Sequence, residues 1–211
     1  MDFSSLLYTI PACLIAIVLH EWAHGYVSYR LGDPTPKLEG RLSLNPLKHL
    51  DLLGTLSLIF FHFGWAKPVP IDTRYYKNQR TGLALVSLAG PAMNFILGFL
   101  FTFIQLLILK YGYYALYTSN IAYYLYVVVY YTAYLNICLG LFNLIPIPPL
   151  DGSKVLYAFL PYETRDQFMQ FERFGGIALI LLLMCGLSSL LSPISSAVYN
   201  FFYNLSIMIL F

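Results

Sequence analysis

Two histidines and a glutamate near the N-terminus lie in the order His20-Glu21-Trp22-Ala23-His24. Residues four apart on an α-helix lie nearly one above the other, so the imidazoles of His20 and His24 would share one face. Two neutral imidazoles at that spacing can bind one zinc ion, and Glu21 would lie close enough to reach a water molecule at the ion. The spacing therefore indicates a metal site with a base beside it, which is the chemistry of hydrolysis.

These ionisable residues lie within an apolar run, and we expect a helix from Phe3 to Arg30 around them. A helix of this length can cross a bilayer, for which roughly 20 residues suffice. Ionisable groups at membrane depth are costly and rare, so their presence needs a physical reason. Pairing among the three without a metal is one explanation, whereas zinc together with a general base accounts for all of them.

Catalytic zinc takes three protein ligands and keeps one position open, so the chain should supply one more His, Asp, Glu or Cys at the same depth. Asp151 is the best candidate, because it follows a proline-rich stretch, Ile145 to Leu150, that cannot continue a helix. Aspartate is also a favoured residue at the start of a helix. A capping role is therefore an equally good interpretation of Asp151 from its position alone.

The composition is that of a membrane protein. Of the 211 residues, 59% are hydrophobic and only 10% are charged, whereas a soluble domain has about 25% charged residues. The net charge of +2 and the lack of a basic cluster give no support to nucleic-acid binding. We therefore expect an all-α polytopic membrane protein with about 4–6 membrane helices.

Further apolar runs predict the remaining helices. The clearest spans run from Gly82 to Leu109, where a turn at Lys110-Tyr111-Gly112 should end the helix, and from Ile121 to Leu144. Three shorter helical segments should follow, the last of them either a short span or an interfacial helix: 150–160, 176–191 and 197–211.

The segment between the first two spans is rich in proline, glycine and polar residues. Alternating residues predict a short strand near 38–44 and a second near 65–69. Residues 56–63 are apolar but too few to cross a bilayer, so we expect this run to dip into the membrane and return. The prediction is a small re-entrant β or loop element after the first helix.

The basic residues then give an orientation. If residues 56–63 return to the side from which they came, Lys110 faces one compartment and all other lysines and arginines face the opposite one. The positive-inside rule makes the compartment with most of them the cytoplasm and puts the N-terminus outside. With this return, the chain crosses the membrane twice between the histidine pair and Asp151. The three residues therefore lie at the same depth, toward the cytoplasmic side.

Three stretches in combination resemble the site-2 protease family of intramembrane zinc metalloproteases. They are HEWAH at 20–24, AGPAMN at 89–94 and FNLIPIPPLDG at 142–152. AGPAMN is similar to the GxxxN signature of that family. The stretches GRLSLNPLKHLD and GWAKPVPI resemble its short, compact subgroup, which lacks PDZ and CBS domains.

The resemblance implies specific roles for individual residues. It implies that His20, His24 and Asp151 bind one zinc ion per chain and that Glu21 is the catalytic residue that activates water. Asn94 and Asn143 match asparagines that line the active site in this family, where they would bind the substrate backbone or stabilise the oxyanion; interhelical hydrogen bonding is the alternative for both.

The expected function is metal-assisted hydrolysis of peptide bonds in or near transmembrane segments of membrane proteins, that is, regulated intramembrane proteolysis. A substrate helix must unwind before attack, because its carbonyls are hydrogen-bonded internally. An edge strand within 38–71 could hold the unwound segment, with the N–H of Val69 as one donor. Two alternatives are a zinc-binding membrane protein without protease activity and a zinc transporter, although the intact Glu21 argues against the first and the lack of a repeat against the second.

We expect one transmembrane metalloprotease domain over 1–211, with a catalytic core at 1–152 and C-terminal helices at 153–211. The expected partners are a transmembrane protein substrate and the lipid bilayer, and no nucleic acid. The expected location is the cell membrane, with the active site toward the cytoplasm. The oligomeric state does not follow from the sequence.

Overall fold

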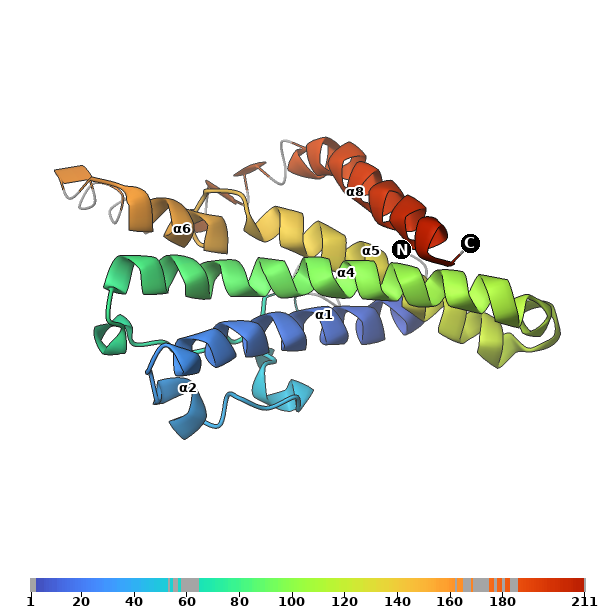
Figure 1. Cartoon of the computed structure of the whole chain (residues 1–211), viewed down its shortest axis with the longest axis horizontal. Coiled ribbons are helices and arrows are strands. Elements are labelled where there is room, and N and C mark those ends of the chain that lie inside the picture. Colours follow the sequence, from blue (N-terminus) through green and yellow to red (C-terminus); the bar gives the residue numbers. More distant parts are fainter. Residues whose placement is uncertain are drawn as a thin grey trace. The chain divides into compact units, whose positions relative to one another are not determined.

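The computed structural model describes residues 3–52, 54, 57, 65–161, 163, 164, 168, 175, 176, 178, 179, 181, 182 and 186–210. No strand occurs among these residues, which fits the all-α class. The elements in chain order are α1 (Phe3–Arg30), α2 (Thr35–Leu38), η1 (Pro46–Lys48), η2 (Thr73–Tyr75), α4 (Gln79–Thr118), α5 (Asn120–Asn143), α6 (Asp151–Phe159) and α8 (Leu187–Leu210) (Figure 1).

Contacts between residues divide the chain into two compact units. The first unit combines Met1–Ala16, Ala92–Asn143 and Ile177–Phe211, and the second combines Ile17–Pro91 and Leu144–Gly176. The helices α1 and α4 each have one part in the first unit and the other part in the second. That the whole chain forms one catalytic domain stays a prediction.

Three helices are long and apolar enough to cross a membrane: Ser5–Arg30, Gln79–Thr118 and Asn120–Asn143. The first and third confirm the spans expected near 3–30 and 121–144. The total of four to six spans stays a prediction. The proposed dip at residues 56–63 lies outside the described residues except for Ser57.

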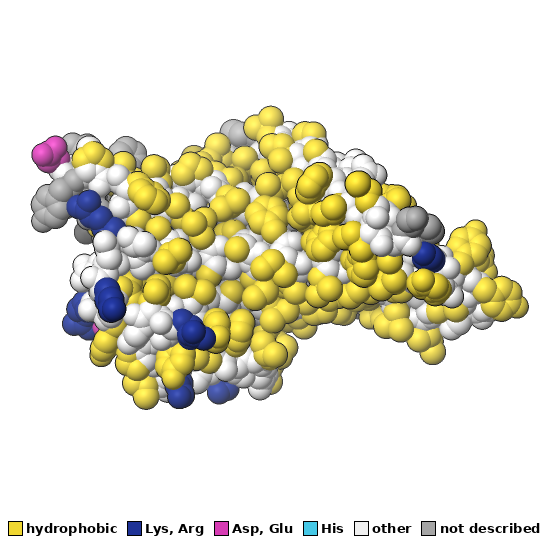
Figure 2. Space-filling view, viewed as in Figure 1, with side chains coloured by type: hydrophobic (Ala, Val, Ile, Leu, Met, Phe, Trp, Pro, Cys, Tyr) yellow, Lys and Arg dark blue, Asp and Glu magenta, His cyan; other side chains and the backbone are white. Residues whose placement is uncertain are grey.

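The surface of the helices is largely apolar. Figure 2 shows hydrophobic side chains covering the visible faces of α4 and α8. Large exposed side chains on these two helices include Ile96 on α4 and Phe201 and Met208 on α8. Lipid, rather than water, is the environment in which such faces are stable.

In the first unit, small residues allow helices to approach closely. A Cβ atom at Gly98 of α4 would lie only 2.7 Å from Cγ1 of Ile137 on α5, and Ile137 is completely buried. The helix α5 also packs against α8, and the hydroxyl of Tyr199 on α8 donates to Gln105 on α4 at 2.7 Å. Small residues and interhelical hydrogen bonds are the usual means of helix association in membranes.

In the second unit, the carboxylate of Asp33 connects the end of α1 to the loop before α4. Its Oδ2 accepts hydrogen bonds from the hydroxyl of Ser28 at 2.7 Å and from the amide of Asp72 at 2.8 Å, and its Oδ1 accepts from the amide of Thr35 at 2.9 Å. The hydroxyls of Ser28 and Tyr76 are also hydrogen-bonded, at 2.7 Å. Asp33 is completely buried, so this network holds two segments that are far apart in the sequence.

The strands expected near 38–44 and 65–69 are wrong for the described residues. The chain forms α2 at Thr35–Leu38, and the only antiparallel bridge described is an isolated one between Leu50 and Ala66. Prolines explain part of the difference, because Pro68 and Pro70 have no N–H for a ladder. The guanidinium of the buried Arg41 also donates to the carbonyls of Lys67 and Pro68, so these carbonyls are satisfied without a partner strand.

Two helix boundaries also differ from the expectation. The helix α4 continues through Lys110-Tyr111-Gly112 to Thr118, because one glycine costs a helix only about 1 kcal/mol. The last helix, α8, begins at Leu187, ten residues before the expected start at Ala197. Both differences have the same cause. A pattern of apolar residues predicts the type of an element better than the residues at which it begins and ends.

We predict that Asp33→Asn destabilises the protein, because an amide NH2 would replace one of the two acceptor oxygens and face a donor. The expected loss is about 1–3 kcal/mol in the free energy of unfolding, measured as a lower midpoint of thermal unfolding in detergent. The matched control is Asp72→Asn, whose carboxylate pairs with the exposed Arg74 and should change the midpoint much less.

The same carboxylate predicts a pH dependence of stability. Burial raises the pKa of Asp33, but hydrogen bonds from Thr35, the Asp72 amide and Ser28 outweigh this effect and hold the pKa below its ordinary value. The stabilisation is therefore complete above the unfolded-state pKa of about 3.9 and is lost as the pH falls through the lower folded-state value. An Asp33→Asn protein that loses stability below pH 4 as steeply as the wild type would contradict this assignment.

Candidate metal centre

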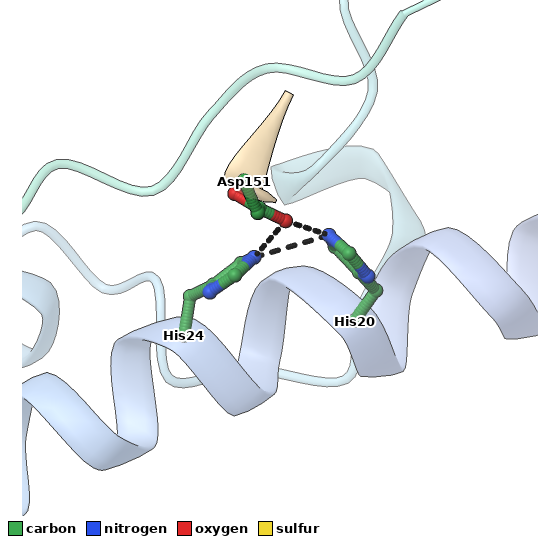
Figure 3. A group of neighbouring side chains, drawn as sticks. All are labelled: His20, His24 and Asp151. Atoms are coloured by element: carbon green, nitrogen blue, oxygen red, sulfur yellow. Dashed lines mark hydrogen bonds and ion pairs between the residues drawn. The ribbon is translucent and has the colours of Figure 1, made fainter. Parts of the chain in front are cut away.

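Three side chains from two separate helices meet at one point in the second unit. Oδ2 of Asp151, the first residue of α6, lies 3.1 Å from Nε2 of His20 and 3.1 Å from Nε2 of His24, both on α1. The two Nε2 atoms are 3.0 Å apart (Figure 3). All three residues are buried. The structure thus brings together the three ligands expected from the sequence.

The separations fit a zinc ion. Zinc binds histidine nitrogen and carboxylate oxygen at about 2.0–2.2 Å with tetrahedral angles, so its ligand atoms lie roughly 3.3 Å from one another. The three distances of 3.0–3.1 Å are close to this value. Among the described residues, His20, His24 and Asp151 are the group whose ligand atoms could hold a metal ion together.

A backbone carbonyl on α4 fixes the tautomer of His24. Its Nδ1 lies 2.6 Å from the carbonyl oxygen of Val86. A carbonyl can only accept, so Nδ1 carries the hydrogen and Nε2 keeps its lone pair. This is the usual way in which a metal-binding histidine is oriented by a group behind it.

The proline-rich stretch after α5 places Asp151. The helix α5 ends at Asn143, and α6 begins at Asp151 with Leu150 as its N-cap residue. Leu150 makes no side-chain cap bond, and the carboxylate of Asp151 points to the histidines instead. Of the two interpretations of Asp151, capping and ligation, the geometry supports ligation.

A glycine after the ligand allows close packing of the backbone. A Cβ atom at Gly152 would lie 2.6 Å from the carbonyl oxygen of Ile145 and still closer to that of Leu144. The hydroxyl of Ser153 donates to the carbonyl of Leu150 at 2.6 Å. The first turn of α6 is therefore held tightly against the segment that precedes it.

The two carboxylate oxygens of Asp151 have different neighbours. Oδ2 lies 3.1 Å from Nε2 of each histidine. The second oxygen, Oδ1, lies 3.7 Å from Nζ of Lys154, one turn further along α6. One oxygen thus faces the metal site, and the other faces a cation.

A second glycine leaves room for the imidazoles. Gly90 on α4 faces the histidine pair, and a Cβ atom there would lie 2.7 Å from Nε2 of His20 and closer still to Nε2 of His24. Real Cβ atoms do not approach other atoms this closely. The first position of the GxxxN stretch is therefore the place where α4 touches the metal ligands.

Glu21 is held by a backbone amide. Its Oε2 accepts a hydrogen bond from the N–H of Val69 at 3.0 Å. This corrects the idea that the N–H of Val69 serves as a strand donor for substrate, because Glu21 already uses it. The guanidinium of Arg41, bound to the carbonyls just before Val69, keeps this loop in place.

A cavity adjoins the metal ligands. Its volume is about 70 Å³, and it is lined by Glu21, His24, Pro68, Val69, Ile71, Val86, Ser87, Asp151 and Lys154. One water molecule needs at least about 10–15 Å³ of such space, so a few can enter. Glu21 and two of the expected metal ligands therefore face a space that can hold water.

The two asparagines lie in the first unit. Nδ2 of Asn94, completely buried, donates to Asn136 of α5 at 2.8 Å and to the carbonyl of Ala16 at 3.3 Å. Nδ2 of Asn143 donates to the carbonyl of Leu139 in its own helix at 3.1 Å. The interhelical bond of Asn94 agrees with the packing alternative, and a substrate role for either asparagine stays a prediction.

Some site residues were missed from the sequence. Val86 acts through its backbone carbonyl, which leaves no trace in the residue type, and the N–H of Val69 was assigned to substrate rather than to Glu21. Lys154 could have been found, because a residue three positions after Asp151 on a helix lies on the same face. Ser87 lies in an apolar run, and only the geometry shows that it lines the cavity.

Comparisons with known proteins point to one family. The profile of Peptidase family M50 matches residues 112–185. The chain is 38% identical over 184 residues to "Putative zinc metalloprotease YwhC" of Bacillus subtilis (strain 168), which covers 86% of this chain and 82% of that protein. No solved structure matches the chain.

More distant relatives carry similar names. The chain is 31% identical over 185 residues to "Putative zinc metalloprotease Rip2" of Mycolicibacterium smegmatis, covering 83% of this chain and 66% of that protein. It is 27% identical over 185 residues to "Zinc metalloprotease MJ0392" of Methanocaldococcus jannaschii, covering 83% of this chain and 42% of the relative.

We predict that Gly90→Ala weakens zinc binding by at least about 10-fold, because the added methyl group displaces the imidazoles. The measurement is zinc per protein after gel filtration in detergent at limiting zinc. Gly112→Ala on the same helix is the matched control, since a Cβ atom there meets nothing closer than 3.7 Å. Equal zinc content in both variants would show that α4 does not constrain the ligands.

Proposed function

Since this chain belongs to peptidase family M50, the site-2 protease family, and is a zinc metallopeptidase of that family, we propose that it cleaves other membrane proteins within or next to their transmembrane segments. Each chain would hold one zinc ion through His20, His24 and Asp151.

One observation carries the proposal. Three metal-ligating atoms lie within 3.1 Å of one another, and two of them belong to α1, which is long and apolar enough to cross a membrane. Glu21 lines the same cavity as His24 and Asp151. A hydrolytic site on a membrane-spanning helix has membrane-embedded peptides as its natural substrates. The carbonyls of such a helix are hydrogen-bonded, so the substrate must unwind locally before cleavage.

The residues of this chain would divide the chemistry as follows. A zinc ion held by the three ligands supplies Lewis acidity at the scissile carbonyl. Glu21 accepts a proton from the water whose oxygen attacks the carbonyl carbon. As the C–N bond breaks, Glu21 returns that proton to the departing amine nitrogen. The amide of Val69 keeps the carboxylate of Glu21 oriented through these steps.

We also propose that the metal centre lies toward the cytoplasmic side of the cell membrane, with the N-terminus outside. Among the described residues, all lysines and arginines except Lys110 belong to the second unit, which also contains the metal centre. Short segments rich in basic residues remain in the cytoplasm. A return of the chain at residues 56–63 is part of this topology.

We predict that Glu21→Gln retains zinc but lowers the rate of peptide cleavage by about 10²–10⁴-fold, because an amide cannot accept the proton. Glutamine keeps an oxygen for the N–H of Val69, so the fold should persist. The measurement is cleavage of a synthetic single-span peptide in detergent micelles or liposomes, together with zinc content. The exposed Glu39→Gln is the matched control, with unchanged cleavage.

Two outcomes would contradict the proposed function. A wild-type protein that binds zinc but leaves every membrane-embedded peptide intact would favour a zinc-binding protein without protease activity. Zinc flux into liposomes that survives Glu21→Gln would favour a transporter.

We predict opposite accessibility for two lysine positions. Lys110→Cys should react with a membrane-impermeant thiol reagent in intact cells, whereas Lys37→Cys should react only after lysis, because the two lie on opposite sides in the proposed topology. Cys13, Cys138 and Cys185 of the parent protein set the background labelling. Labelling of both positions from the same side would overturn the topology.

A further inference from the structure

Two hydrogen-bond donors at the cavity are already occupied. Nδ1 of His24 donates to the carbonyl of Val86, and the amide of Val69 donates to Glu21. The half-exposed ammonium group of Lys154 forms an ion pair with Oδ1 of Asp151 at 3.7 Å, and its three N–H bonds leave it able to contact other groups.

The hydroxyl of Ser87 is different. Ser87 lines the cavity, is 2% exposed, and its Oγ has no hydrogen-bond partner among the described residues. Burying a hydroxyl without a hydrogen-bond partner is unfavourable. Buried polar groups are rarely left in this state, and those that are need an explanation such as a bound molecule or a catalytic role.

The position of Ser87 on α4 suggests what it binds. The preceding residue, Val86, orients His24 through its carbonyl, and Gly90, three positions later, faces both histidines. Residues three and four apart lie on one face of a helix. Ser87 thus lies on the stretch of α4 that contacts the expected metal ligands, and it lines the same cavity as Glu21.

From this geometry we infer that Ser87 is a catalytic residue whose hydroxyl donates a hydrogen bond to the carbonyl oxygen of the scissile peptide. The inference rests on the proposed function, because it needs a peptide substrate. As the water oxygen attacks the carbonyl carbon, the C=O π electrons move onto that oxygen, and the hydrogen bond from Ser87 strengthens as negative charge develops. A donor that is already buried needs no reorganisation at that moment, which is how oxyanion-binding groups accelerate acyl transfer.

The test compares Ser87→Ala with the wild type on a synthetic peptide containing one apolar segment of roughly 20 residues. We expect kcat to fall about 10²-fold, the effect of losing one oxyanion donor, while KM changes less than about 3-fold. Zinc content should be unchanged. The midpoint of thermal unfolding should stay the same or rise, since the substitution removes an unpartnered polar group.

A second readout does not depend on turnover. A phosphinic peptide carries a tetrahedral anionic group that resembles the transition state, so it should bind the zinc-loaded wild type at least about 10-fold more tightly than zinc-loaded Ser87→Ala. The uncleaved substrate peptide should bind both alike. This comparison remains informative if the wild type cleaves nothing, so the failure of the proposed function and the failure of this inference are distinguishable.

Ser206→Ala is the matched control, because it removes an equally buried serine hydroxyl that already donates to the carbonyl of Phe202 at 2.8 Å. Its kcat and phosphinic peptide affinity should equal those of the wild type. Unchanged kcat in Ser87→Ala, a change in KM alone, or a loss of kcat that follows a loss of zinc or of thermal stability would each overturn the inference.

Discussion

The Nε2 atoms of His20 and His24 and Oδ2 of Asp151 lie together in a buried volume, and no two of these atoms are more than 3.1 Å apart. Such atoms repel one another unless a proton or a metal cation lies between them, and burial removes the water that would otherwise screen them. Features around them follow from this constraint. Gly90 leaves space for the imidazoles, the carbonyl of Val86 directs one lone pair inward, and the prolines before Asp151 deliver the carboxylate at the start of a helix.

Two of the expected site residues are oriented by the main chain of neighbouring segments. His24 is fixed by a carbonyl on α4 and Glu21 by an amide in the loop before it. That loop is in turn held by the buried guanidinium of Arg41. Backbone groups on well-packed segments are stiffer supports than long side chains, because they lose little additional entropy when they bind. The precision of the site therefore depends on packing that extends well beyond the ligands.

Much of this arrangement could be anticipated from the sequence, and the remainder has identifiable causes. The spacing of His20 and His24 on an apolar helix was sufficient to predict their common face, and the resemblance resolved Asp151. The prediction of strands was wrong because alternating side chains do not reveal that the side chain of Arg41 donates hydrogen bonds to two backbone carbonyls. The role of Val86 and the partner of the Val69 amide could not be assigned, since a backbone donor or acceptor exists at nearly every residue.

The small cavity beside the ligands has a consequence for the entry of a peptide. A space of about 70 Å³ admits water, but an unwound peptide of even a few residues is several times larger. Each turnover must therefore begin with displacement of a wall, and the loop bearing Pro68 and Val69 is the part of the lining outside any helix. Displacement of that loop would break the hydrogen bond from the amide of Val69 to Glu21, so the loop would have to close again before Glu21 regains its orientation.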